Sequence, residues 1–147
     1  MKKLFLGSGL LLIFLLLILF NQKKAQREIL LSQTPVYKIA LVKPPLNASA
    51  NEPVEFVWDI MAPDTATTPT TTIYHSPVSS PSALTTSDSP SAVGYSNWLT
   101  DYLSGNFFLP DTFSATASFL KGTIFYRAYA KVGDQHLWSE EIKLTVN

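Results

Sequence analysis

Much of the chain alternates apolar and polar residues with a period of two, which is the pattern of strands that bury one face. Five segments carry it: VYKIALVK (36–43), VEFVWDI (54–60), TTIYH (71–75), DTFSATASF (111–119) and GTIFYRAYAKVGDQHLWSEEIKLTV (122–146). In the last segment, Gly133 and Asp134 predict the turn of a hairpin. About six strands follow, with no helix between them to connect parallel neighbours, and this predicts an all-β antiparallel sandwich.

The alternation also predicts which side chains face the core. Trp58 shares a face with Val54, Phe56 and Ile60, so we expect it at the centre of the sandwich. In the closing hairpin we expect one buried face, which comprises Ile124, Tyr126, Ala128, Ala130, Val132, Trp138, Ile142, Leu144 and Val146. The opposite face carries Phe125, Arg127, Tyr129 and Lys131.

Two segments interrupt the alternation. SPVSSPSALTTSDSPSAVG (76–94) is rich in serine, threonine and proline and lacks the apolar surface that would offset its ordering entropy. It predicts a long, mobile surface loop, and a disordered linker is the alternative. SNWLTDYLSG (96–105) predicts one helical turn, with Ser96 or Asn97 as its cap and Gly105 at its end.

The N-terminal segment predicts a membrane anchor. LFLGSGLLLIFLLLILF (4–20) is 17 residues without a charge, which is just long enough to span a bilayer as a helix. No small-residue cleavage site follows it, so we expect an anchor at 1–21, a stalk at 22–34 and the sandwich at 35–147, with a cleaved, secreted chain as the alternative. Lysines flank the apolar run on both sides and leave the orientation undetermined, but the composition of the domain favours a location outside the cytoplasm.

Two segments resemble the fibronectin type III and immunoglobulin-like families. In PPLNASANEPVEFVWDIMAP (44–63), the matching positions are Pro45, Asn47, Pro53, Phe56, Trp58 and Pro63. The segment 122–146 is similar to the last two strands of the family, although the tyrosine that often closes a corner there falls on Ile124, with Tyr126 two residues later. The resemblance implies a fibronectin type III-like sandwich with an adhesive, spacer or interaction role.

Composition provides few candidates for chemistry. The formal net charge is zero, which argues against nucleic acid as a partner, and the lack of cysteine excludes disulfides and thiolate sites. His75 and His136 are interpreted as exposed loop residues rather than metal ligands. Glu140 and Glu141 are neighbours in a predicted strand, so their side chains point to opposite faces and form a poor acid–base pair. We therefore predict no catalytic residue, no metal and no cofactor.

The aromatic residues after the loop are the candidate interaction surface, and they are Tyr95, Trp98, Tyr102 and Phe108. They predict either a small core that holds the loop or an exposed platform for a glycan or a surface protein. Asn47 in NAS also fits an N-glycosylation acceptor. The sequence thus predicts a membrane-anchored, extracytoplasmic module with a structural, adhesive or interaction role. The alternative is a small accessory subunit of a membrane complex that acts through its transmembrane helix.

Overall fold

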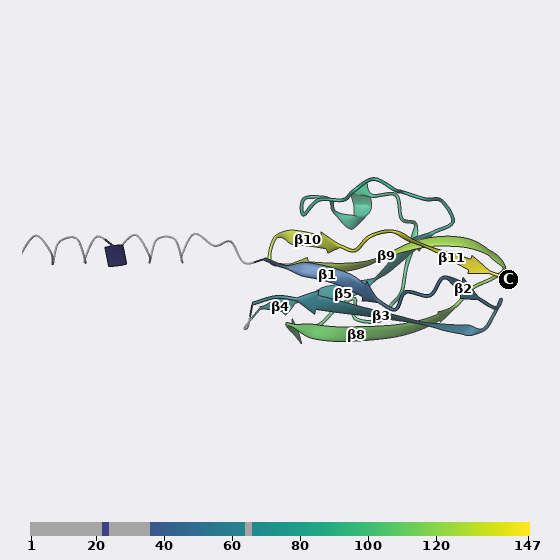
Figure 1. Ribbon diagram of the computed structural model, residues 1–147, viewed down its shortest axis with the longest axis horizontal. Coiled ribbons are helices and arrows are strands. Elements are labelled where there is room, and N and C mark those ends of the chain that lie inside the picture. Colours follow the sequence, from purple (N-terminus) through teal and green to yellow (C-terminus); the bar gives the residue numbers. More distant parts are fainter. Residues whose placement is uncertain (1–21, 24–35, 64–65) are drawn as a thin grey trace, which may run out of the picture. The chain divides into compact units, whose positions relative to one another are not determined.

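The computed structural model describes residues 22–23, 36–63 and 66–147. The predicted anchor at 1–21 and most of the predicted stalk at 22–34 lie outside the described residues. Gln22 and Lys23 are helical, and within the described ranges no helix has the length and apolarity needed to cross a membrane. Val36–Asn147 forms one compact unit, which Figure 1 shows as a stack of strands.

Two sheets make up the compact unit. The smaller sheet has the order β1 (Lys38–Val42), β3 (Pro53–Met61), β8 (Asp111–Ser118). The larger has the order β2 (Asn47–Ala48), β11 (Ile142–Val146), β9 (Gly122–Val132), β5 (Thr70–Ser76), β6 (Asn97–Trp98), and β10 (Gln135–Trp138) also pairs with β9. A separate pair joins β4 (Thr67–Thr68) to β7 (Phe107–Phe108), and a short 3₁₀ helix, η1, spans Pro90–Ala92.

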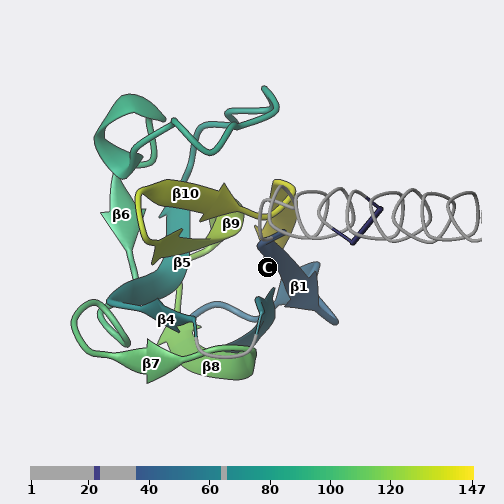
Figure 2. The same cartoon turned by 90° about the vertical axis from the view of Figure 1, so that its left-hand side faces the viewer.

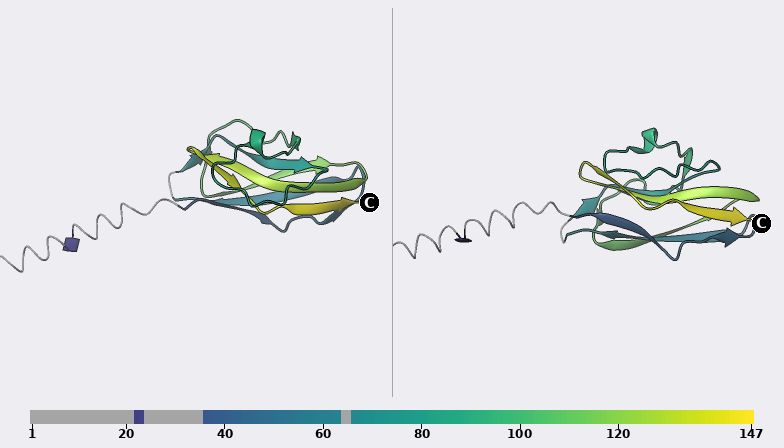
Figure 3. Two further views of the ribbon diagram at one scale, coloured as in Figure 1. Left: turned by 90° about the horizontal axis from the view of Figure 1, so that it is seen from above. Right: turned by 45° about the horizontal axis from the view of Figure 1, so that its top comes forward.

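The connections between the strands are immunoglobulin-like. The long strands β3, β5, β8 and β9 alternate between the two sheets along the chain, and each neighbouring pair of long strands is antiparallel. Figure 3 shows the two sheets stacked, with their strands running along the same axis. This alternation is the topology of an immunoglobulin-like sandwich, so the predicted all-β class and the immunoglobulin-like architecture are confirmed.

Trp58 is the centre of the core, as predicted. Its side chain is fully buried and stacks on Phe113 with ring centroids 5.9 Å apart. The indole Nε1 donates a hydrogen bond of 2.8 Å to Thr71 Oγ1, and that hydroxyl donates one of 2.6 Å to the carbonyl oxygen of Tyr129. Trp58 therefore connects the two sheets through β5, and its one polar atom is satisfied inside the core.

A β-bulge separates β10 from β11. Trp138 is opposite Tyr129 and Ile142 is opposite Tyr126, so three residues, Ser139 to Glu141, face only two on β9. The Oγ atom of Ser139 accepts a hydrogen bond of 2.8 Å from the backbone N–H of Ala128 and thereby replaces a main-chain partner. Because of the extra residue, the side chains that face the core have odd numbers before the bulge and even numbers after it.

Because of the bulge, the predicted buried face of the hairpin is right for β9 and wrong for Trp138. The even-numbered positions of β9 from Tyr126 to Val132 lie in the core, and after the bulge so do Leu144 and Val146. On β10, however, the core residue is Leu137, and Trp138 lies on the outer face of the larger sheet.

The segment before β3 crosses from one sheet to the other. β1 pairs with β3 in the smaller sheet, whereas β2 pairs in parallel with β11 in the larger one. Three main-chain hydrogen bonds extend the second pairing, and they join Thr145 N to Leu46 O, Asn147 N to Ala48 O and Ala50 N to Asn147 O. Asn47 is therefore the first residue of β2.

A tyrosine hydroxyl fixes this crossing. The Oη atom of Tyr126 donates a hydrogen bond of 2.9 Å to the carbonyl oxygen of Pro45. The position where the related families often place a corner tyrosine is occupied by the half-buried Ile124. The chain thus uses the tyrosine two residues later, and it binds a segment 81 residues away in the sequence.

The predicted helical turn within 96–105 is wrong. This segment runs beside β5, where the N–H of Leu99 donates to Ile73 O and the N–H of Thr71 donates to Tyr102 O. The hydroxyl of Thr72 also donates to Leu99 O, at 2.7 Å. The open edge of β5 offers backbone groups that must be paired, and this tertiary pairing outweighs the weak local preference for a helix. Figure 2 shows β6 at this edge.

Candidate functional site

Aromatic side chains form a row across the outer face of the larger sheet. We call Trp98, Tyr74, Tyr129, Trp138 and Tyr95 the outer aromatic row. Its ring centroids are 5.8 Å apart for Trp98 and Tyr74, 5.4 Å for Tyr74 and Tyr129, 4.6 Å for Tyr129 and Trp138 and 6.2 Å for Tyr95 and Trp138. The row arises because β6, β5, β9 and β10 are adjacent and each contributes one outward ring.

The row is covered at one end and open at the other. Tyr95 and Tyr129 are buried, whereas Trp98 on the edge strand β6 is 49% exposed. An exposed indole supported by a second ring offers a flat, rigid, apolar surface with one hydrogen-bond donor. Such a surface can bind the apolar face of a sugar ring or a side chain of a protein partner.

The Ser/Thr/Pro segment lies beside β10 (Figure 1) and covers the closed end of the row, where Trp138 binds it. Beyond Ser76, the last residue of β5, it contains no strand, but its main chain is bound to the sheet at several points. Arg127 Nη2 donates to the carbonyl oxygens of Ser80 and Ser82 at 2.9 and 3.1 Å, and Trp138 Nε1 donates to that of Asp88 at 2.8 Å. Backbone carbonyls therefore hold this loop, although its side chains supply little apolar surface.

A buried charge network lies under the loop. The guanidinium of Arg127 donates from Nε to the hydroxyl of Tyr95 and from Nη1 to the carbonyl oxygen of Ser139, both at 2.8 Å. The Tyr95 hydroxyl in turn donates to Glu141, which also accepts hydrogen bonds from Ser79 Oγ and Ser80 N. The Tyr95 hydroxyl thus bridges Arg127 and Glu141, and each of these two residues also forms hydrogen bonds with the loop.

The network shifts the acid–base behaviour of its members. Burial by itself would raise the pKa of Glu141, but hydrogen bonds from Ser79, Tyr95 and Ser80 and the charge of Arg127 outweigh it and lower that pKa. Burial, together with the hydrogen bond to Glu141, raises the pKa of the Tyr95 hydroxyl. The carboxylate is therefore held ionised and the phenol protonated, which is the combination the hydrogen bonds require.

The free energy of unfolding should fall in acid in two steps. Burial lowers the pKa of His75, so below about pH 6.5 the unfolded chain binds a proton that the folded chain resists. The lowered pKa of Glu141 adds a second loss below about pH 4.3, as protonation removes the charge that the network stabilises. Urea unfolding from pH 8 to 3.5 measures both steps. His75→Gln should remove the first step, whereas identical curves for His75→Gln and the parent would contradict the assignment.

The structure places the four predicted site residues in different surroundings. Tyr95 belongs to the covered end of the outer aromatic row. Tyr102 packs edge-on against Trp58 and Phe113, so it closes one side of the core. Trp98 is half exposed beside Tyr74, and Phe108 is 73% exposed on β7. Tyr95 thus contacts the residues that hold the loop, whereas the side chain of Trp98 is half exposed.

Three residues of this site were not expected from the sequence. Arg127 and Tyr129 were assigned to the outer face of β9 and yet are buried, because the loop covers them. Glu141 has the partners that bind the loop, whereas its neighbour Glu140 is exposed. Both glutamates lie in the bulge at Ser139 to Glu141, and the apolar pattern of the sequence does not indicate this bulge.

The histidines also differ from the prediction. His75 lies in β5 and packs edge-on against Phe119, and His136 lies in β10, where Nδ1 shares a hydrogen bond of 2.8 Å with the Tyr129 hydroxyl. Burial, together with the neighbouring Tyr74, raises the pKa of Tyr129 to about 12. Neither histidine is the exposed loop residue that was predicted. Within 36–63 and 66–147, no group of three or more His, Cys, Asp or Glu side chains could hold a metal ion.

Two solved structures share a remote structural likeness with the chain. No family model matches the chain, and no curated protein matches it. The CARDB domain of a Pyrococcus furiosus protein, solved in complex with di-metal ions, is 10% identical over 78% of this chain and 90% of its own, with a TM-score of 0.41.

A second likeness is to a chain of the complex between zinc 2-glycoprotein and prolactin inducible protein from human seminal plasma. It is 13% identical over 79% of this chain and 98% of its own, with a TM-score of 0.45. Likenesses this remote carry no argument about function. The strand order itself defines the chain as an immunoglobulin-like β-sandwich.

Proposed function

We propose that the chain is a membrane-anchored, extracytoplasmic immunoglobulin-like module that binds a surface protein or a glycan. The uncharged run at 4–20 would anchor it in the cell membrane as a single-pass protein. The sandwich would then be displayed outside the cytoplasm. The fibronectin type III variety of the fold is supported by β6, which pairs with β5, whereas constant-type immunoglobulin domains place their extra strand beside the equivalent of β8.

The observation that carries the binding role is the exposed end of the outer aromatic row. Trp98 lies on an edge strand, is 49% exposed and is backed by Tyr74. Aromatic rings with a buried support and an open face are typical of interaction surfaces, because they bring large contact area at a small entropic cost. We propose that Trp98 is the central contact of this surface and that Tyr74 is its support.

The surroundings of the ionisable groups Glu141 and Arg127 also agree with a binding role. Glu141 accepts three hydrogen bonds that hold it against the loop, and Arg127 is buried under the same loop. These groups stabilise the fold through hydrogen bonds to the loop and to the sheet. We therefore propose a module without catalytic activity, cofactor or nucleic-acid partner.

Location is tested with a C-terminal tag on the full chain in intact cells. External protease should remove the tag, the chain should stay in carbonate-washed membranes, and mass spectrometry should find the N-terminus before residue 21. A mature N-terminus between residues 22 and 31 would instead favour the cleaved, secreted form. Protection of the tag inside intact cells would contradict the proposed orientation.

Binding is tested with Trp98→Ala in the full chain. Retention on isolated cell-envelope glycans or on surface proteins from the same cells should be lost, while the melting temperature stays within a few degrees of the parent. Leu120→Ala removes an apolar side chain that is more exposed than Trp98 and lies elsewhere, and it should change neither. Unchanged retention by Trp98→Ala, with co-purification of integral membrane proteins that depends on residues 4–20, would favour the accessory-subunit alternative.

A further inference from the structure

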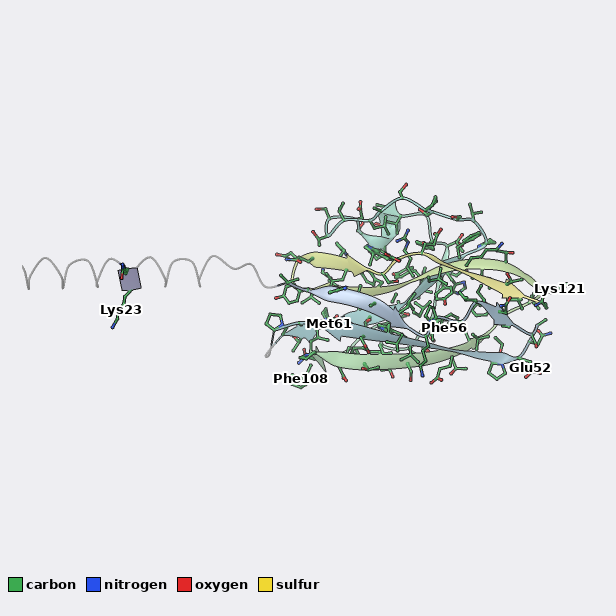
Figure 4. The ribbon with its side chains drawn as sticks, in the orientation of Figure 1. Lys23, Glu52, Phe56, Met61, Phe108 and Lys121 are labelled. Carbon is green, nitrogen blue, oxygen red and sulfur yellow. The ribbon has the colours of Figure 1, made fainter. Side chains whose placement is uncertain are left out.

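One end of the sandwich carries three exposed apolar side chains. Val36, Met61 and Phe108 are 82%, 52% and 73% exposed, and we call them the apolar tip. Met61 is paired with Lys38 at the start of β1. Phe108 is paired with Thr67 on β4, and Leu109 N donates to Ala66 O in the same region. Figure 4 shows Met61 and Phe108 at this end of the sandwich.

The opposite end mixes apolar and charged side chains. Leu120 is exposed in the turn between β8 and β9, and Leu46 is exposed beside Thr145 near the end of β11, while the polar residues Asn51, Glu52 and Lys121 are exposed at that end too. Figure 4 shows Glu52 and Lys121 at that end. Single exposed apolar residues are common on protein surfaces, whereas several at one end indicate a surface that contacts a membrane or another apolar surface.

The chain that leads into the tip indicates what covers it. β1 begins at this end, so residues 1–35 join the sandwich there. Only the 15 residues 21–35 separate the uncharged run at 4–20 from Val36. Covalent geometry limits a spacer of this length to at most about 50 Å. That tether gives the tip a high effective concentration at the bilayer, so even a weak contact would be populated.

We propose that the apolar tip rests in the headgroup–acyl boundary of the membrane that holds the anchor, an inference that depends on the anchoring proposed above. The charges that the strand pairing places beside Met61 are mixed, with Lys38 opposite Met61 and Asp111 opposite Ile60. Attraction to anionic lipid is therefore not the source of the contact. The matching surface is a zwitterionic phospholipid interface, entered by Phe108 and Met61 through the hydrophobic effect.

The chain contains no cysteine, so a single introduced cysteine can report on each end. Asn106→Cys lies next to β7 and Lys121→Cys lies at the far end, and both native side chains are exposed. The full chain would be reconstituted into phosphatidylcholine nanodiscs with an environment-sensitive fluorophore on either cysteine. Lipids with a spin label near the headgroup should quench more than about half of the emission at position 106 and little at position 121.

A second variant shows whether the apolar side chains cause the contact. Met61→Ser with Phe108→Ser, added to Asn106→Cys, should reduce the quenching to the level of position 121. Both residues are exposed, so circular dichroism should show the fold retained. Equal quenching at both ends, or quenching that persists in the double serine variant, would overturn the proposal. So would quenching that requires added anionic phosphatidylserine, because it would assign the contact to the lysines.

Co-flotation of the same samples with lipid separates this inference from the anchoring on which it depends. A chain that does not float would refute both proposals. A chain that floats, but whose two reporters are quenched alike, would leave the anchoring in place and refute the contact of the tip.

Discussion

Replacing Trp58 with alanine is expected to lower the free energy of unfolding by about 3–5 kcal/mol. The side chain is fully buried and stacks on Phe113, so its loss leaves a cavity at the centre of the sandwich. The substitution also removes the donor to Thr71 Oγ1, which leaves a buried hydroxyl with one partner fewer. A loss of this size is a large part of the 5–15 kcal/mol that typically stabilises a domain.

Urea unfolding followed by tryptophan fluorescence or circular dichroism measures this loss. Trp98→Ala is the matched control, because it deletes the same side chain from a half-exposed position and should cost no more than about 1 kcal/mol. If the two variants unfold at the same urea concentration as the parent, Trp58 does not occupy the core and the assignment of β3 is wrong.

Replacing Arg127 with methionine is expected to be the second most damaging change, with a loss of about 3 kcal/mol. Methionine fills much of the same space but donates no hydrogen bond. The carbonyl oxygens of Ser80, Ser82 and Ser139 would each lose a charged donor, and the carboxylate of Glu141 would lose its nearby positive charge. The loop should therefore detach before the sandwich unfolds.

Limited proteolysis and amide exchange distinguish detachment of the loop from global unfolding. In the parent chain, the amide of Ser80 should be protected by its hydrogen bond to Glu141. In Arg127→Met this protection should disappear, and cleavage within 77–93 should appear under conditions that leave the strands intact. Lys143→Met removes an exposed charge from the adjacent strand and should behave like the parent. A loop equally open to protease in the parent and in Arg127→Met would mean that the arginine does not hold it.

The strands and the centre of the core could be predicted from the sequence because they depend on local alternation. β3, β8 and β9 all show it, and Trp58 follows from the phase of β3 alone. The side chain of Trp138 could not be placed in this way. Its orientation is set by the one-residue bulge, in which Ser139 Oγ takes the place of a main-chain partner of Ala128. The pattern of apolar residues does not indicate that a side chain takes this place.

The covered half of the site was beyond prediction for a different reason. Composition reports on side chains, but the loop is held by its backbone carbonyls, and every residue has one. Arg127, Tyr95 and Glu141 are also dispersed in the sequence, so only the fold brings them together. Alternation alone assigns Arg127 and Tyr129 to solvent, because it treats the outer face of a sheet as open.

The four candidate aromatic residues illustrate the same limit. Tyr95, Trp98, Tyr102 and Phe108 lie in one short segment, and their residue types alone do not distinguish core from surface. Tyr102 adopts a positive φ of 56°, and its ring packs against Trp58 and Phe113. Trp98 instead follows the edge strand β6 and remains half exposed. Predicting the aromatic character of the segment was possible, but its division between core and surface required the path of the backbone.

The parallel pairing of β2 with β11 has a mechanical consequence. β1 starts at one end of the sandwich and β11 ends at the other (Figure 1), so a load between Val36 and Asn147 runs along the strands. It pulls β2 and β11 in opposite directions, and the three main-chain hydrogen bonds between 46–50 and 145–147 lie across it. Such bonds are strained together in shear rather than opened one after another. The module is thus suited to carry tension along its length, which single-molecule stretching between the two ends would register as one abrupt rupture.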